Sequence, residues 1–155
     1  MSDPGNRILI RHLAPRNFLS FGPDNPGIEL QALNVLIGPN GSGKSNLFEA
    51  ISLIRSAPKE LREVTRKGGG VREWIWKGGT KAPASVDCVV RDSKDSIPLR
   101  HLLSFRSVAQ AFSLEDERVE RAHPQAGQPD VDFFYRYQHG QPVVKIGRAS
   151  CRERV

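Results

Sequence analysis

The stretch GPNGSGKS, from Gly38 to Ser45, matches the pattern GxxxxGK[ST] at every fixed position. It follows the apolar run Leu33 to Ile37 and precedes an amphipathic helical pattern. Its glycines permit backbone dihedrals that a residue with a Cβ would resist, so the N–H groups from about Asn40 to Ser45 can surround a phosphate group. The stretch therefore predicts a phosphate-binding loop between a strand and a helix.

The residue types in this loop predict a nucleotide site that also holds magnesium. Lys44 can reach the β- and γ-phosphate oxygens as a point charge, and the positive end of the following helix faces the same anion. The Ser45 hydroxyl is the expected ligand of a Mg²⁺ ion that bridges these phosphates. The predicted nucleotide-binding residues are Gly38, Pro39, Asn40, Gly41, Ser42, Gly43, Lys44, Ser45 and Asn46.

The segments beside the loop support this interpretation. The nearly continuous apolar run Leu33 to Ile37 predicts a central strand that is buried on both faces. After the loop, apolar residues recur at helical spacing and predict a helix from about Gly43 to Ser56 that ends before Pro58. The apolar face of that helix is formed by Leu47, Ala50, Ile51 and Ile54.

The rest of the chain reads mostly as strands and turns. A short strand is expected at Ile8 to Ile10, a turn at Gly22 to Gly27 and a second strand at Ile28 to Leu30. A charged helical stretch, Lys59 to Lys67, ends at three glycines. One further predicted strand has Trp74 and Trp76 on one side, and another has Val86, Cys88 and Val90 on one face. Four more are predicted at Arg100 to Phe105, Gln110 to Val119, Phe133 to Gln138 and Gln141 to Lys145. A turn at His139 and Gly140 joins the last two.

The wording of two stretches resembles a known group of proteins. GPNGSGKSNLFEAI, which begins at Gly38, resembles the phosphate loop of the ABC, SMC and RecF group of ATPases, including OLD (overcoming-lysogenization-defect) nucleases and related predicted AAA-type ATPases. RNFLSF, from Arg16 to Phe21, is similar to the NF(R/K)SF stretch of SMC-like and RecF-like heads. This sequence departs from the group at Leu19, where the group usually has a basic residue able to touch the nucleotide, and that contact is lost or passes to a neighbour such as Arg16.

The resemblance implies a fold and a set of ligands. It implies an α/β P-loop NTPase head of which this chain is the N-terminal lobe, with a central strand, a P-loop helix and a flanking antiparallel β subdomain. ATP and Mg²⁺ are the implied cofactors, and the full-length form would hydrolyse ATP in DNA repair, chromosome segregation or phage defence. The implied partners are a second head, which would bind through the lobe missing here, and DNA.

Several motifs of such ATPases are missing from the sequence. Hydrolysis needs a second motif of four aliphatic residues ending in Asp and usually Glu, and the closest stretch, Val86 to Asp92, is interrupted by Asp87 and Arg91. The acids Glu115 to Glu117 follow only a mixed stretch, and no LSGGQ-like signature occurs. We therefore expect no complete set of catalytic residues. The guanine-reading NKxD element is also absent, which argues against a GTPase.

The last ten residues, IGRASCRERV, show no apolar periodicity of a helix or strand, and they resemble the translation of a widely used short-read sequencing adapter. The alternative is a genuine basic tail that binds nucleic acid. We expect residues 1–145 to be a partial P-loop ATPase head and residues 146–155 to be a non-native, loosely packed tail.

Composition adds few constraints. The net charge is +6, and the tail carries part of that excess, so the remaining basic residues fit a solvated helical face or a DNA-binding surface. These residues include Arg55, Arg62, Arg66, Lys67 and Arg72. No segment is apolar enough to span a membrane, and Cys88 without Cys151 cannot form an intrachain disulfide, so a cytoplasmic setting is expected. The histidines are dispersed without metal-ligand spacing.

Two functional hypotheses from different classes follow. In the first, the chain is the N-terminal lobe of an SMC-, RecF- or OLD-like ATPase. In the second, it is a nucleotide-binding module without turnover. An Asp-Glu motif and a signature in the source DNA beyond the codon of Lys145 would favour the first hypothesis, and a stop codon there the second. A third possibility, a small-molecule P-loop kinase, requires a parallel crossover that the predicted order of elements does not provide.

Overall fold

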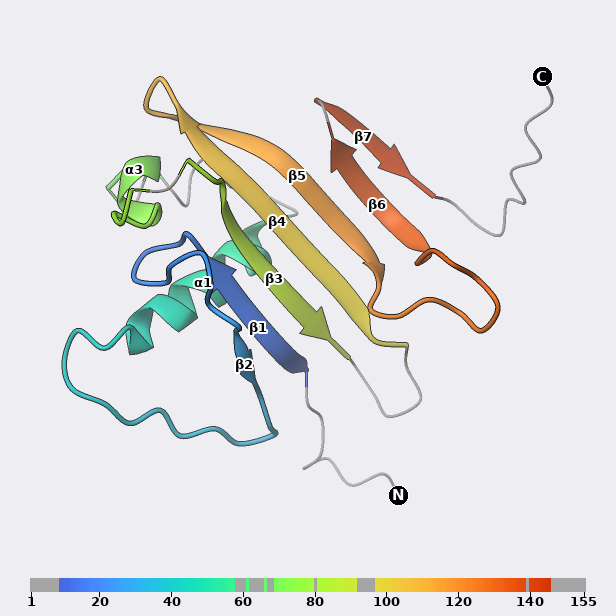
Figure 1. Ribbon diagram of the computed structural model, residues 1–155, viewed down its shortest axis with the longest axis horizontal. Helices are drawn as coiled ribbons and strands as arrows, with labels where there is room; N and C mark the ends of the chain where they lie inside the picture. Colours follow the sequence, from blue (N-terminus) through green and yellow to red (C-terminus); the bar gives the residue numbers. More distant parts are fainter. Residues whose placement is uncertain are drawn as a thin grey trace.

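The computed structural model describes residues 9–57, 61, 66, 69–79, 81–91, 97–138 and 140–145. Its strands form one seven-stranded sheet in the order β2-β1-β3-β4-β5-β6-β7 (Figure 1). All neighbouring strands in this sheet are antiparallel. The strands are β1 (Ile10–Arg16), β2 (Ile28–Glu29), β3 (Ala84–Val90), β4 (Leu99–Val108), β5 (Ala111–Arg121), β6 (Phe133–Gln138) and β7 (Gln141–Val144), and the helices are α1 (Lys44–Ser56) and α3 (Val71–Trp74).

Most of the predicted elements are confirmed, including the helix after the glycine-rich loop and the antiparallel strands after residue 83. The first strand lies later than expected, because β1 begins at Ile10 and runs to Arg16. The predicted helical stretch Lys59 to Lys67 lies largely outside the described residues, as do His139 and the tail from Ile146 to Val155. No helix in the described part of the chain is long and apolar enough to cross a membrane.

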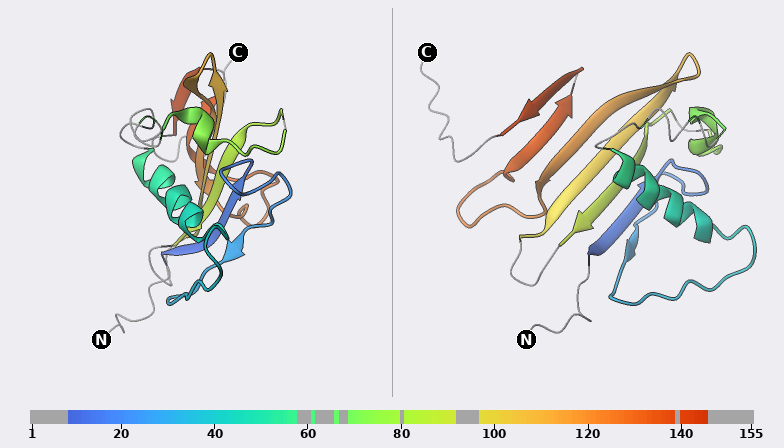
Figure 2. Two further views of the ribbon diagram at one scale, coloured as in Figure 1. Left: turned by 90° about the vertical axis from the view of Figure 1, so that its left-hand side faces the viewer. Right: turned by 180° about the vertical axis from the view of Figure 1, so that it is seen from behind.

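One hydrophobic core lies between the sheet and the helices, and α1 covers one face of the sheet near β1 and β3 (Figure 2). Phe18 is fully buried there, with its ring edge-on to Trp74 at 5.6 Å and to Phe105 at 6.4 Å between centroids. The other buried members include Leu13 of β1, Val86 and Cys88 of β3, Leu103 of β4, and Ala50 and Leu53 of α1. This core fixes the position of α1 and therefore of the loop that precedes it.

The segment Leu33 to Ile37 is irregular, so the prediction of a central strand here is wrong. The side chains of Leu33, Val35 and Ile37 are 82%, 75% and 91% exposed. A strand needs a neighbouring backbone to complete its ladder of hydrogen bonds, and none of the described strands pairs with this segment. The Asn34 side chain instead closes a local turn through two 2.8 Å hydrogen bonds with the backbone of Gln31.

The prediction of a strand around Trp74 and Trp76 is also wrong, because Val71–Trp74 forms the short helix α3. Gly70, at φ 99°, precedes this turn, and its carbonyl accepts a hydrogen bond from the Glu73 N–H at 3.1 Å. Burial of Trp74 against Phe18 stabilises the turn. Tertiary packing has overridden an alternating pattern that is typical of a strand.

The sheet face opposite α1 carries a ladder of alternating charges across four strands: Asp87 of β3, Arg100 of β4, Glu120 of β5 and Arg136 of β6. Arg100 Nη2 lies 2.6 Å from Asp87 Oδ2, and Arg100 Nη1 lies 3.4 Å from Glu120 Oε1. Arg136 Nη2 lies 3.3 Å from Glu120 Oε2. Hydrogen bonds from Arg100 to Asp87 raise the pKa of this guanidinium further above its usual value.

Replacement of Phe18 by alanine should lower the free energy of unfolding by about 3 to 5 kcal/mol, because it leaves a cavity among buried aromatic rings. Urea denaturation followed by tryptophan fluorescence measures this change. The matched control is Phe48→Ala, at a side chain that is 62% exposed, and it should change the unfolding free energy by less than about 1 kcal/mol. Equal effects of the two substitutions would contradict the core described above.

Burial, and then the charge of Asp87, raise the pKa of the Cys88 thiol to about 12. Iodoacetamide reacts with the thiolate, so Cys88 in a Cys151→Ser chain should react about a thousandfold more slowly at pH 8 than an ordinary thiol. In guanidinium chloride the same chain should react at the ordinary rate. Mass spectrometry of the alkylated protein measures both rates, and fast labelling of the folded chain would contradict the burial of Cys88.

Candidate nucleotide-binding site

The loop from Gly38 to Gly43 turns sharply before α1. Gly41 lies at φ 81° and Gly43 at φ 90°, in the left-handed region that glycine adopts most easily. The Ser42 N–H donates to the Pro39 carbonyl oxygen at 3.3 Å, and the loop is otherwise exposed. Two of the glycines therefore occupy the conformations that the sequence pattern requires of a loop that closes around an anion.

The N-terminus of α1 is free of competing side chains. Helix α1 begins at Lys44, directly after Gly43, with no side-chain cap and no acidic residue in its first turn. The first backbone N–H groups of a helix lack intrahelical partners, and with the helix dipole they favour a bound anion. In α1 the Asn46 N–H already donates to the Gly43 carbonyl oxygen at 3.0 Å, so the N–H groups of Lys44 and Ser45 are the ones that remain for an anion. The end of the helix thus presents donors and partial positive charge to the space inside the loop.

The Lys44 ammonium lies inside the loop. Its Nζ donates to the carbonyl oxygens of Gly38 and Pro39, both at 2.7 Å, and to Ser42 Oγ at 3.2 Å. These contacts use all three donors of an ammonium group. The structure therefore brings Lys44, Gly38, Pro39 and Ser42 together.

A second segment contacts the loop from the side of the sheet. Ser20 Oγ accepts a hydrogen bond from Asn46 Nδ2 at 2.8 Å. A Cβ at position 43 would lie 2.8 Å from the same Ser20 Oγ, so a larger residue there would displace the Ser20 hydroxyl. The glycine-rich pattern indicates Asn46 as a site residue but does not include Ser20, for which the stretch RNFLSF is the signal in the sequence.

Neither residue considered for the missing basic contact is directed to the loop by the contacts described. Leu19 packs against the hydrophobic core, and its N–H donates to the Trp74 carbonyl oxygen at 2.9 Å. Arg16 Nε donates to the Asn25 carbonyl oxygen at 3.1 Å. Ser20 is the residue of this stretch that reaches the first turn of α1.

A cavity of about 610 Å³ lies beside the N-terminal half of α1. Lys44 and Ser45 contribute its polar atoms on the helix side. The remaining lining is mostly apolar and comes from β1, β2, the segment 34–36 and α1: Leu13, Ile28, Leu30, Asn34, Val35, Leu36, Leu47, Phe48 and Ile51. Its lining thus includes part of the irregular apolar segment and none of the charged residues Asp87, Arg100, Glu120 and Arg136.

The P-loop class of nucleotide-binding proteins has a strand, a glycine-rich loop and a helix in this order, and the described chain has the loop and the helix after an irregular segment. Residues 33–144 match the family described as "AAA domain, putative AbiEii toxin, Type IV TA system". The match covers more than half of the chain, which belongs to this family of AAA domains. The family indicates an ATPase-type, nucleotide-binding function.

Two curated proteins are similar to parts of the chain. The chromosome condensation protein dpy-27 of Caenorhabditis elegans is 35% identical over 77 residues, which cover 44% of this chain and 5% of that protein. The chromosome partition protein Smc of Mycolicibacterium paratuberculosis is 26% identical over 98 residues, which cover 61% of this chain and 8% of that protein. The chain thus resembles an N-terminal fragment of an SMC-like ATPase and spans a small part of these relatives' length. No solved structure matches it.

Replacement of Lys44 by alanine should weaken Mg²⁺-ADP binding by about 2 to 4 kcal/mol, because it removes a charge that faces several phosphate oxygens. Isothermal titration calorimetry on the full chain measures this loss. The matched control is Lys77→Ala, whose ammonium pairs with Glu73 at 3.2 Å away from the loop, and it should bind as the unaltered chain does. Equal affinity of the Lys44→Ala and unaltered chains would overturn the assignment of the loop.

Proposed function

We propose that this chain binds ATP or ADP with Mg²⁺ through the loop Gly38 to Ser45, as the N-terminal lobe of an SMC-like AAA ATPase head. The main observation behind this proposal is that the glycine-rich loop leads directly into the N-terminus of α1. Gly41 and Gly43, both at positive φ, lead directly into an uncapped thirteen-residue helix. Lys44 adds the one cationic side chain whose contacts lie inside this loop, among the described residues.

In the proposed complex, backbone N–H groups, Lys44 and Ser45 would each contact a different part of the Mg²⁺-nucleotide. The N–H groups from Asn40 to Ser45 would hold the β-phosphate, and Lys44 would contact the β and γ oxygens. The carbonyl oxygens of Gly38 and Pro39 are neutral acceptors, whereas phosphate oxygens are anionic and add a charge–charge attraction to the ammonium, so they can displace the carbonyl oxygens. Ser45 is exposed beside this position and would hold the Mg²⁺ ion, which neutralises phosphate charge when bound.

The exposed apolar surface near the loop supports the proposal that residues 1–145 are a partial head. Helix α1 buries Ala50 and Leu53 against the sheet, while Phe48 on another side is 62% exposed. Phe48 and Ile51 face the cavity together with Val35 and Leu36. A helix that is apolar on more than one side is typical of an element covered on both sides. In the proposed complete head, further polypeptide covers this surface.

The acidic residues considered for catalysis are occupied by basic partners on the sheet. Asp87 is bound by Arg100, and Glu115 pairs with Arg106. Asp116 pairs with Arg118 at 2.5 Å, and Glu117 lies 2.9 Å from His101 Nε2; Asp92 lies outside the described residues. A general base must reach the attacking water beside the phosphates, and none of these contacts places a carboxylate there.

This chain should therefore bind nucleotide without turning it over. Steady-state phosphate release from the full chain with Mg²⁺-ATP should not exceed background, because acceleration requires an oriented water and charges aimed at the transferring group. Magnesium-dependent binding in the same sample shows that the site is intact. Release near the rate of complete ATPases, abolished by Lys44→Ala, would reveal a general base among the paired acids and contradict the proposal.

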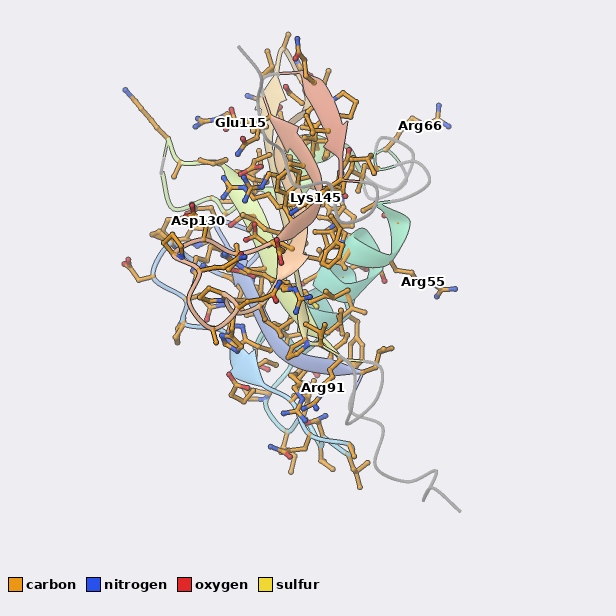
Figure 3. The ribbon with its side chains drawn as sticks, turned by 90° about the vertical axis from the view of Figure 1, so that its right-hand side faces the viewer. Arg55, Arg66, Arg91, Glu115, Asp130 and Lys145 are labelled. Atoms are coloured by element: carbon orange, nitrogen blue, oxygen red, sulfur yellow. The ribbon has the colours of Figure 1, made fainter. Side chains whose placement is uncertain are left out.

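For the complete protein, we extend the proposal to ATP hydrolysis between two heads, with DNA as a partner. The similarity to proteins named for chromosome condensation and chromosome partition favours this extension. The DNA contact would lie on the helix side, where Arg55 and Arg66 extend away from the molecule (Figure 3). The alternative, a binding module without turnover, predicts that the source gene encodes no Asp-Glu motif after Lys145. An antiparallel sheet after α1 argues against a small-molecule kinase.

A further inference from the structure

We propose that Ser20 is a positioning residue for the phosphate loop: through Asn46, its hydroxyl holds the first turn of α1 in place against the sheet. The inference rests on the proposed nucleotide-binding function of that loop. Its starting point is the 2.8 Å hydrogen bond from Asn46 Nδ2 to Ser20 Oγ, which joins residues far apart in the sequence.

Ser20 lies at the tip of a tight turn. The Phe18 N–H donates to the Phe21 carbonyl oxygen at 3.0 Å, and the Phe21 N–H donates back to the Phe18 carbonyl oxygen at 2.8 Å. Leu19 lies at φ 49°, a left-handed conformation that is unusual for a residue with a side chain. Two central residues, Leu19 and Ser20, thus form a turn with fixed backbone geometry.

The surrounding structure holds this turn from several directions. Phe18 is fully buried, the Leu19 N–H donates to the Trp74 carbonyl oxygen at 2.9 Å, and the Trp76 N–H donates to the Asn17 carbonyl oxygen at 2.9 Å. Asn17 lies at φ 51°, and its Nδ2 donates to the Pro83 carbonyl oxygen at 3.1 Å. Unfavourable backbone conformations persist only where neighbouring contacts determine them, and they cluster at functional sites. The turn is therefore a rigid support.

The turn that carries Ser20 contacts the phosphate loop where the loop joins α1. The Asn46 N–H donates to the Gly43 carbonyl oxygen at 3.0 Å, so Asn46 is tied by its backbone to the loop and by its side chain to Ser20. Gly43 lies directly against the Ser20 hydroxyl, and its φ of 90° strains any residue with a Cβ at this position. Around Gly41 the loop is exposed, and a Cβ at Gly41 would have no atom within 4 Å.

This arrangement lowers the ordering cost of phosphate binding. A loop that is already fixed in its binding conformation loses less freedom when the ligand arrives, so affinity rises without a new ligand contact. A hydroxyl can accept the Asn46 amide while keeping its own O–H available as a donor. Alanine at 20 removes the acceptor, and threonine keeps it, which makes the two substitutions a matched pair.

The test compares Mg²⁺-ADP binding by calorimetry for the full chain and for Ser20→Ala, Ser20→Thr, Asn46→Ala and the double variant Ser20→Ala/Asn46→Ala. Each alanine variant should weaken binding by about three- to tenfold, the double variant should be no weaker than the weaker single variant, and threonine should restore most of the affinity. Ser52→Ala, at an exposed hydroxyl on the same helix, should bind as the unaltered chain does.

Two further measurements separate positioning from stability and from the proposed function. Urea midpoints should be the same for all variants, since the bond is exposed. Amide hydrogen exchange of residues 41–47 in the nucleotide-free chain should be faster in Ser20→Ala than in Ser20→Thr. If the unaltered chain does not bind Mg²⁺-ADP, the proposed function fails, and the exchange rates still decide whether Ser20 holds the loop. Additive losses, or unchanged exchange in Ser20→Ala, would overturn the positioning role.

Discussion

The burial of Phe18 is the interaction on which the other parts of this structure depend. Its ring contacts Trp74 and Phe105, so it joins the turn after β1 to α3 and to β4. The backbone on either side of it closes the turn that carries Ser20, and that turn meets the junction of Gly43 and α1. One buried aromatic side chain thus links the sheet to the loop through continuous packing and hydrogen bonding.

The spacing of apolar residues predicted most of the helices and strands, because most of them bury one apolar face in the core. The helix after the loop has an apolar face that packs on the core, and β3 alternates Ala84, Val86, Cys88 and Val90 toward that same core. The two failures have different physical reasons. The segment Leu33 to Ile37 has strand composition but no described strand to pair with. The alternation around Trp74 was real, but burial of the indole against Phe18 favoured a helical turn.

The features of the candidate site that depend on residues close in the sequence could be predicted. Those that depend on contacts between residues far apart in the sequence could not. Glycine spacing indicated the positive φ values of Gly41 and Gly43, and the lysine position indicated a cation inside the loop. The contact between Ser20 and Asn46 could not be derived in the same way, because the two residues are 26 positions apart. In addition, tertiary packing sets the turn that contains Ser20. The roles of these residues toward a nucleotide stay predictions.

The ladder formed by Asp87, Arg100, Glu120 and Arg136 disfavours the packing of a second sheet on the part of the sheet that carries it. Glu120 is only 4% exposed at its side chain and is shared between two guanidinium groups, so its charge is compensated within one sheet. Stacking a second sheet on this face would remove the arginines from water without supplying new partners, and that desolvation is unfavourable. Among the described residues, exposed apolar side chains lie around Val35, Ile37 and Phe48 beside the loop, and also at Phe134, Val143 and Val144 of β6 and β7. Covering the apolar surface beside the loop removes none of the ladder's arginines from water, so this desolvation cost does not apply there.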